Sequence, residues 1–206
     1  MIPLSLAMEI IGVTASGALS PGPLTFAAIV GGRASGAKYG LLEALGHTAF
    51  ELPLFVLLGL GCSAIVAGSS TLKLVSALGG ISLLAYAVLT LRSLFSEASP
   101  TKPRAPSAHP TAVGFMLTAF NPFFIAWWLS AGVKLVTDIL TYSSGLTFLL
   151  VSYATHVWMD YAWLAAVAHL ARTGGAKLPR GMTLVQVALT LILAYYGLVF
   201  LSSVFT

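Results

Sequence analysis

Long apolar runs dominate this chain and alternate with short polar segments. Six such runs can be drawn, at Ile2–Val30, Leu41–Ala67, Leu72–Phe95, Ala112–Val136, Thr147–Ala171 and Leu184–Val204. Each holds about twenty or more residues, enough for an α-helix to cross a hydrocarbon core about 30 Å thick. The pattern predicts an all-α integral membrane protein with six transmembrane helices. We expect a single domain over residues 1–206, because the spans share one packed interior.

Composition supports a membrane protein and excludes several classes of function. The chain is 58% hydrophobic and 8% charged, and its mean hydropathy is +0.95. No stretch remains for a soluble catalytic domain. The single cysteine, Cys62, excludes internal disulfides and a dithiol relay. The net charge of +4 does not indicate a nucleic-acid partner, because the basic residues lie at loop ends and form no patch with interleaved aromatics. No cofactor is expected.

The basic residues indicate how the chain is oriented in the membrane. Eight of the ten follow the first, third or fifth run, and two follow the second or fourth. The first group is Arg33, Lys38, Arg92, Lys102, Arg104, Arg172, Lys177 and Arg180, and the second is Lys73 and Lys134. The positive-inside rule places the rich side in the cytoplasm. We therefore expect a multi-pass protein of the cell membrane with both termini outside the cytoplasm.

A proline-rich segment divides the chain into two halves. Four prolines fall within 100–110, which excludes a helix and predicts an extended linker over 96–111. The halves, 1–95 and 112–206, hold three predicted spans each. An odd number of spans gives the second half the opposite orientation in the membrane. The expected architecture is therefore two inverted three-helix repeats, a common design of secondary transporters.

Prolines interrupt the first and fourth predicted helices, at Gly17–Pro23 and Thr118–Pro122. Proline removes a hydrogen-bond donor and clashes with the preceding turn, so both helices should kink or break. Ser20 and Asn121 precede the prolines and are favoured N-cap residues. Free N–H groups at the start of a half-helix favour an anion, such as an amino-acid carboxylate. The predicted substrate-binding residues are Ser20, Pro21, Gly22, Pro23, Asn121 and Pro122; a simple packing kink is the alternative.

Two predicted helices carry the same ionisable pair, His47 with Glu51 and His156 with Asp160. Residues four apart share one helix face, so each histidine can reach its acid. A carboxylate at the bilayer centre costs roughly 3 kcal/mol, so it needs a polar partner or a water-filled cavity. We interpret the four residues as proton-coupling groups, with a structural hydrogen bond between helices as the alternative. Glu43 lies one turn before His47, and we expect it at the interface or tuning His47.

These features resemble the LysE/RhtB family of amino-acid exporters. The resemblance covers nearly the whole chain and rests on Ser20-Pro21-Gly22-Pro23, Gly36, Gly40, Gly46, Gly114-Phe115, Asn121-Pro122 and Asp160-Tyr161-Ala162-Trp163. It implies a six-helix exporter that forms a homodimer and moves amino acids or similar solutes outward. The chain departs from the family pattern at two positions. Leu24 stands where a polar residue often follows the first motif, and Phe123 where a basic residue often follows the second; both bear on the substrate.

Three functions follow as hypotheses. The first is a proton-coupled exporter of amino acids or related small zwitterions, in which Glu51 and Asp160 exchange protons. The second is a divalent-cation exporter, since two histidines and two carboxylates can form a metal shell, although no cysteine lies near either pair; we assign no metal residue. The third is an intramembrane enzyme with Ser20 and His47 as nucleophile and base. Nothing in the sequence supplies a third orienting group or an oxyanion site, so we expect a transporter and not an enzyme.

Overall fold

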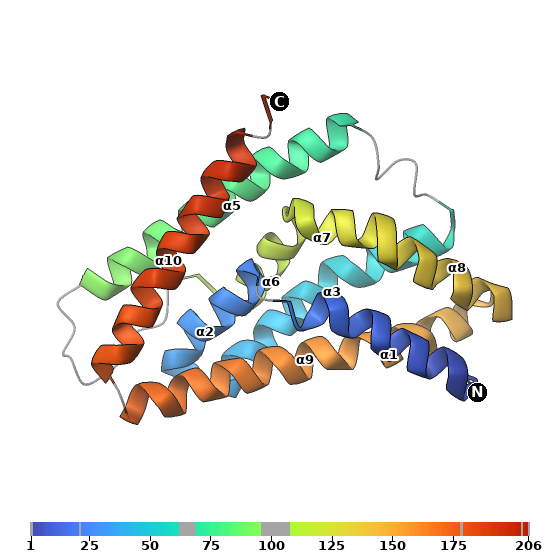
Figure 1. The fold of residues 1–206 in the computed structure, drawn as a ribbon, viewed down its shortest axis with the longest axis horizontal. Coiled ribbons are helices and arrows are strands. Elements are labelled where there is room, and N and C mark those ends of the chain that lie inside the picture. The colour runs from blue at the N-terminus through green and yellow to red at the C-terminus, as the bar shows by residue number, and fades with distance from the viewer. Residues whose placement is uncertain are drawn as a thin grey trace.

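The protein is built from helices (Figure 1). The computed structural model describes residues 2–20, 22–61, 69–95, 108–177, 179–202 and 204–205. Pro21, Cys62 and most of the predicted linker, at 96–107, lie outside them. All regular secondary structure of the described residues is helical, as predicted. The elements are α1 (Leu4–Ala18), α2 (Pro23–Ser35), α3 (Ala37–Gly59), α5 (Ser69–Phe95), α6 (Pro110–Ala119), α7 (Pro122–Trp127), the π-helical turn η1 (Trp128–Gly132), α8 (Val133–Tyr142), α9 (Leu146–Lys177) and α10 (Pro179–Ser202).

The first predicted helix is broken, as expected, into α1 and α2, which are bent by 71° relative to each other. The predicted cap is wrong, however. Helix α2 begins at Pro23 with Gly22 as its N-cap, whereas the Ser20 hydroxyl donates to the carbonyl of Ser16 at 2.7 Å. Of the two prolines in this segment, Pro23 takes the first helical position, where its missing N–H costs nothing. Ser20 is therefore joined to the end of α1 and does not start α2.

The second break is confirmed with the predicted cap. Helix α6 ends at Ala119, and Asn121 is the N-cap of α7. The Asn121 Oδ1 accepts from the backbone N–H groups of Phe123 at 3.0 Å and Phe124 at 3.4 Å. From Pro122 to Tyr142 the chain stays helical. The π turn η1 lies within this segment, and such turns are frequent at functional sites.

Long apolar helices of the described residues agree with a membrane protein. Ala37–Gly59 and Pro122–Tyr142 are each long and apolar enough to cross a membrane, and the bent pair α1–α2 makes a third span if counted as one. Each of the six predicted runs overlaps one or more helices of the described residues. The count of six spans, the inverted repeat and the division into two halves stay predictions. Large apolar side chains on the outside, including those of Leu184, Leu191 and Leu198, suit contact with lipid.

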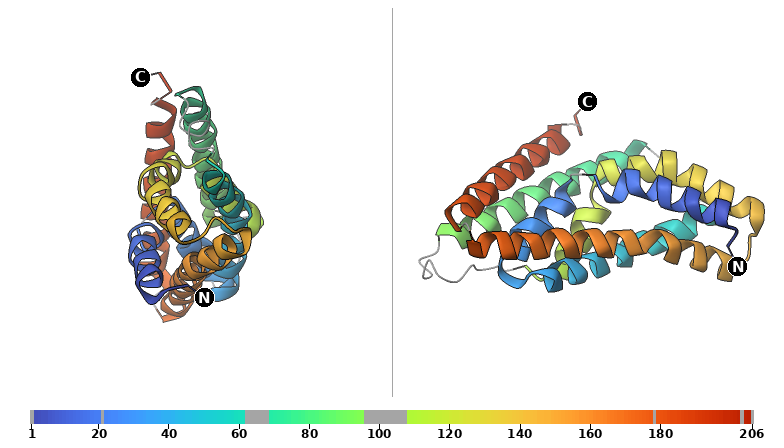
Figure 2. Two further views of the ribbon diagram at one scale, coloured as in Figure 1. Left: turned by 90° about the vertical axis from the view of Figure 1, so that its right-hand side faces the viewer. Right: turned by 60° about the horizontal axis from the view of Figure 1, so that its bottom comes forward.

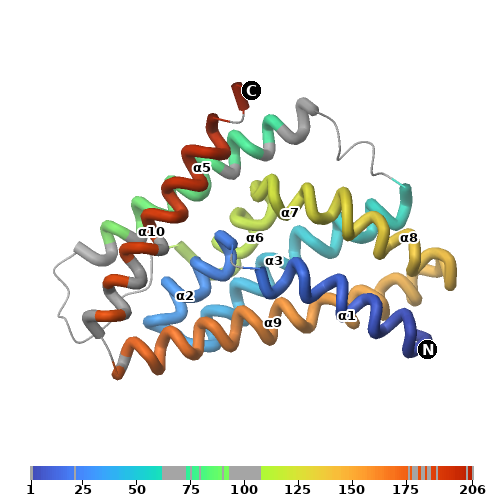
Figure 3. Tube along the Cα trace, viewed as in Figure 1, coloured from blue at the N-terminus to red at the C-terminus, as the bar shows by residue number. Residues whose placement is uncertain are grey.

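Helix α3 lies between α6 and α9, α2 packs on α9, and α5 packs along α10. The turned views keep α5 and α10 side by side (Figure 2), and in the Cα trace α3 runs from its start beside α2 and α9 toward α8 (Figure 3). Glycines bring α3 and α6 into backbone contact. A Cβ atom on Gly46 would overlap the carbonyl oxygen of Thr111, and one on Gly114 would overlap the carbonyl oxygen of Glu43. These two glycines therefore determine the position of α6 along the axis of α3.

The larger apolar core joins α1, α3, α8 and α9 and includes Trp128 and Tyr153. Both of these side chains also donate hydrogen bonds to Glu51. The core therefore continues directly into the polar centre of the protein.

Candidate functional site

A cavity of about 370 Å³ lies at the two helix breaks. Residues of α2, α3, α6, α7, η1 and α9 and of the end of α1 line it. Eight of the predicted site residues line it: Ser20, Gly22, Pro23, His47, Glu51, Asn121, His156 and Asp160. Pro122 is not among the lining residues. The two breaks and the two ionisable pairs, separated by about a hundred residues in sequence, thus meet at one place.

Glu51 is the centre of the polar network and is 2% exposed. Its Oε1 lies 3.1 Å from the Nε2 of His47 and 3.3 Å from the Nε2 of His156. Trp128 Nε1 donates to the same oxygen at 3.3 Å, and the Tyr153 hydroxyl donates to Oε2 at 2.9 Å. A carboxylate buried in lipid needs such partners. Groups from α3, η1 and α9 together hold this one.

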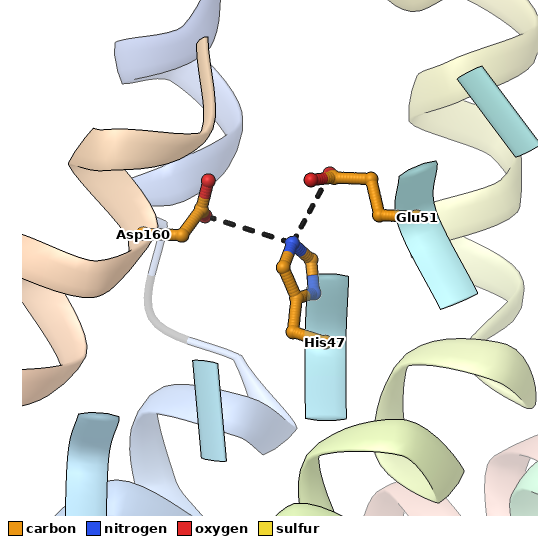
Figure 4. Close-up of side chains that lie close together, drawn as sticks. All are labelled: His47, Glu51 and Asp160. Atoms are coloured by element: carbon orange, nitrogen blue, oxygen red, sulfur yellow. Dashed lines mark ion pairs between the residues drawn. The ribbon is translucent and has the colours of Figure 1, made fainter. Parts of the chain in front are cut away.

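The predicted pairing is right for one histidine and wrong for the other. His47 meets Glu51 on its own helix, whereas His156 meets Glu51 across the helix interface. No ion pair joins His156 to Asp160 in the part of the chain that the structure describes. Asp160 faces His47 instead, with Oδ1 3.8 Å from Nε2 (Figure 4). Spacing of four residues allows a contact on one helix, but the packing of α9 on α3 turns the His156 ring toward the acid of α3.

Two threonines hold the far sides of the two imidazole rings. The Thr118 Oγ1 lies 2.9 Å from the Nδ1 of His47 and donates to the carbonyl of Gly114 at 2.7 Å. The Thr14 Oγ1 lies 2.7 Å from the Nδ1 of His156 and donates to the carbonyl of Ile10 at 2.6 Å. A hydroxyl has one proton to donate, and in each case it is used on a carbonyl.

The threonines therefore determine which ring nitrogen carries hydrogen. Because each hydroxyl can only accept from the imidazole, Nδ1 must be the N–H donor in both His47 and His156. Each Nε2 then faces the Glu51 carboxylate. An unprotonated Nε2 and a carboxylate oxygen are both acceptors, so they cannot form a hydrogen bond with each other unless a proton is added between them. The site consequently has a place for one added proton at each of these two contacts.

Two further polar features escaped the sequence interpretation. Thr14 is fully buried. The signal available in the sequence was a hydroxyl-bearing residue inside a predicted apolar span. Glu43, expected at the interface or tuning His47, is 0% exposed and so lies inside the helix bundle, and neither carboxylate oxygen has a hydrogen-bond partner among the described residues. Asp160 Oδ2 also has none within the described chain.

The two half-helix ends are not equivalent as anion sites. The Asn121 side chain already accepts from the first N–H groups of α7, so these are not available to a ligand. No side chain caps the N-terminus of α2, and its first residues, from Pro23 to Thr25, line the cavity. Backbone N–H groups and the helix dipole favour negative charge at such an end. Of the two ends that were expected to favour an anion, the end at α7 is thus already capped, and the end at α2 stays a prediction.

Three of the ionisable groups also lie close enough to surround a cation. One ligand atom from each of His47, Glu51 and Asp160 can be chosen so that all lie within 4.8 Å of one another. One imidazole nitrogen and two carboxylates form a donor set that divalent cations accept. This geometry keeps the second hypothesis open.

Comparison with known proteins agrees with this architecture. The family model of the LysE type translocator matches residues 15–204. Searches of curated proteins and of solved structures found no match. The matched range includes both helix breaks and all four ionisable residues of the two pairs. The resemblance seen in the sequence is thus confirmed: the chain belongs to the LysE type translocator family, a family of transporters that move small solutes across membranes.

Proposed function

We propose that this protein exports amino acids or related small zwitterions in exchange for protons. The observation that carries the proposal is that one cavity has two poles of opposite character. The uncapped N-terminus of α2 forms the pole that favours an anion. The carboxylates of Glu51 and Asp160 form the other. A free amino acid presents a carboxylate and an ammonium group and so matches both.

The size and lining of the cavity support a solute of this class. About 370 Å³ lies at the lower end of ligand pockets, which run from roughly 300 to 1,000 Å³. Apolar side chains complete the walls, among them Leu24, Leu117 and Phe123. Leu24 and Phe123 are the two departures from the family pattern. Their apolar character favours a solute with an apolar side chain, and L-leucine is accordingly our first probe.

Proton coupling follows from competition for the same carboxylates. Asp160 has one oxygen without a hydrogen-bond partner in the described structure and lines the cavity. Either a proton or the ammonium group of the solute can satisfy it. A carrier that offers one site to two positively charged species exchanges one for the other. Outward movement of the solute would then accompany inward movement of a proton.

The threonine–histidine contacts also support the inverted repeat. In one half Thr14 of α1 meets a histidine of the second half, and in the other half Thr118 of α6 meets a histidine of the first. Exchanging the halves exchanges the two contacts. Transporters of inverted-repeat design place their sites at such an interface. The homodimer and the extracytoplasmic termini stay proposals of the same scheme.

Matched ligands test the two-pole site directly. Purified protein is titrated with L-leucine, leucinamide and N-acetyl-leucine, following a screen of common amino acids by thermal stabilisation. Loss of a hydrogen bond to a charged group costs about 1.5–3 kcal/mol, so both modified ligands should bind about tenfold more weakly or worse. In Asp160→Asn the preference over N-acetyl-leucine should shrink, while the preference over leucinamide stays. Equal affinity for the best amino acid of the screen, its amide and its N-acetyl form would disprove the site.

The divalent-cation exporter remains the second candidate because of the His47, Glu51 and Asp160 geometry. Protein purified without chelators is analysed for Mn²⁺, Zn²⁺ and other metals. One bound ion per chain that is lost in Asp160→Asn would favour a cation as the transported species. Absence of stoichiometric metal, with amino-acid binding present, would eliminate this candidate.

A further inference from the structure

Helix α3 presents a row of four ionisable side chains on one buried face. Tyr39, Glu43, His47 and Glu51 follow at steps of four residues, and all are buried. Side chains at this spacing are neighbours, with Cβ atoms about 6 Å apart. The last two belong to the site described above. The first two extend the row beyond the cavity, toward the junction of α3 with α2.

Glu43 is the member of this row that the transport scheme leaves without a role. It is 0% exposed, and neither of its oxygens has a hydrogen-bond partner among the described residues. An ionised carboxylate without a hydrogen-bond partner is very costly in such surroundings. The backbone contact of α6 at Gly114 closes this side of α3. This carboxyl is therefore a candidate proton-binding group one turn from His47.

Charged neighbours do not explain its burial. Helices α2, α6, α8 and α9 pack against α3, and Tyr86 of α5 contacts Tyr39 at the start of α3. Their titratable or charged residues are Arg33 on α2; Lys134, Asp138 and Tyr142 on α8; and Tyr153, His156, Asp160, Tyr161, His169, Arg172 and Lys177 on α9; α6 has none. Within the described residues none of these forms a hydrogen bond or an ion pair with Glu43. A purely structural acid would be expected to have such a partner.

At the Tyr39 end of the row, two tyrosine hydroxyl groups contact each other. The Tyr39 and Tyr86 hydroxyls lie 3.2 Å apart, and Tyr86 also donates to the carbonyl of Ala27 at 3.4 Å. Tyr39 follows Lys38 near the start of α3, at the end that the positive-inside rule assigns to the cytoplasm. Hydroxyl groups both donate and accept, so they can pass a proton along a chain.

We propose that Glu43 is a second proton-binding site, which connects the cavity to the cytoplasmic end of α3. Building on the proposed proton exchange, the path for an inward proton runs from Glu51 through His47 to Glu43. Protonated Glu43 first releases its proton past Tyr39 and becomes a carboxylate, and Glu51 passes a proton to the Nε2 of His47. The imidazolium then gives its Nδ1 proton to the Glu43 carboxylate after a side-chain rearrangement, because Nδ1 contacts Thr118 and Glu43 has no hydrogen-bond partner among the described residues in this conformation. Each step moves one proton and leaves the donor ready to be refilled.

Infrared spectroscopy tests this site with protons alone as the probe. Difference spectra of the purified full-length protein between acidic and alkaline buffer report the carbonyl stretch of protonated carboxyl groups. One such band should be lost in Glu43→Gln and retained in Glu9→Gln, the matched control at an acid far from the row. If Glu43→Gln does not fold, Glu43→Asp keeps an acid and should shift the band. A spectrum unchanged by the Glu43 variants overturns the proposal.

Transport in proteoliposomes separates this proposal from the function on which it rests. Exchange of labelled for unlabelled L-leucine requires no net proton movement and should survive in Glu43→Gln. Proton flux driven by a leucine gradient should fall about a hundredfold, the scale of a positioned proton-transfer group, and Glu43→Asp should restore part of it. Coupled flux in Glu43→Gln equal to that of the unsubstituted protein overturns the role of Glu43. Absence of coupled flux in the unsubstituted protein refutes the proposed exchange instead, and the infrared result then still decides whether Glu43 binds a proton.

Discussion

Replacing Glu51 with glutamine changes the charge at the centre of the site and almost nothing of its shape. The carboxylate accepts hydrogen bonds from Trp128 at 3.3 Å and Tyr153 at 2.9 Å, and both histidines face Oε1. A glutamine amide keeps one acceptor oxygen and turns an NH₂ group toward the other donor. At least one hydrogen bond to a charged group is lost, which costs about 2 kcal/mol. For a chain of this size the melting temperature should fall by about 6 °C.

The functional effect of Glu51→Gln should exceed the structural one. The variant removes the carboxylate that both Nε2 atoms face, so a proton-driven efflux assay should show no transport and no response to pH. Tyr153→Phe removes a single hydrogen bond and should lower the melting temperature without abolishing transport. Asp138→Asn, at a partly exposed acid of α8 that pairs with Lys134 outside the cavity, is the matched control and should leave both properties nearly unchanged, since a surface ion pair contributes little. Glu51→Gln that transports at the normal rate with unchanged pH dependence would show that this acid is structural.

The remaining predictions concern packing, capping and orientation. Gly114→Ala places a Cβ against the α3 backbone and should lower the unfolding free energy by about 2 kcal/mol. The control Gly12→Ala, whose Cβ meets no atom within 4 Å, should be neutral or stabilising. Equal melting temperatures of the two variants would contradict the α3–α6 contact. Asn121→Ala should cost about 1 kcal/mol through loss of the cap, while Ser20→Ala, which caps no helix, should cost less in the same denaturation assay. A reporter fused at the C-terminus should be active outside the cell and one in the 96–111 segment inside; a cytoplasmic C-terminus would refute the orientation.

Proline chemistry made the two helix breaks predictable, but not the identity of both caps. Asn121 precedes a single proline, so the rule for N-caps applied without competition. The first break contains Pro21 and Pro23, and either could have started the second helix. The choice of Pro23 moved the cap to Gly22 and left the N-terminus of α2 without a side-chain cap. That outcome changes which half-helix end is open to a ligand.

The contacts between helices could not be predicted from spacing alone. The interval of four residues correctly paired His47 with Glu51, because both lie on α3. For His156 the rotation of α9 against α3 decides the partner, and this rotation depends on backbone contacts such as that of Gly40 with the Leu164 carbonyl. The burial of Glu43 inside the bundle could not be predicted, because a residue's position along a helix does not show which neighbouring helix covers it. Thr14 was missed because its role depends on a histidine 142 residues away.

Proton movement driven by an amino-acid gradient tests the central claim most directly. Purified protein in proteoliposomes with a trapped pH indicator is given a gradient of L-leucine, or of the best amino acid of the binding screen, without a pH gradient. The account predicts proton flux opposite to the solute, abolished in both Glu51→Gln and Asp160→Asn. Solute movement without any proton flux would contradict the exchange of protons for zwitterions at this site.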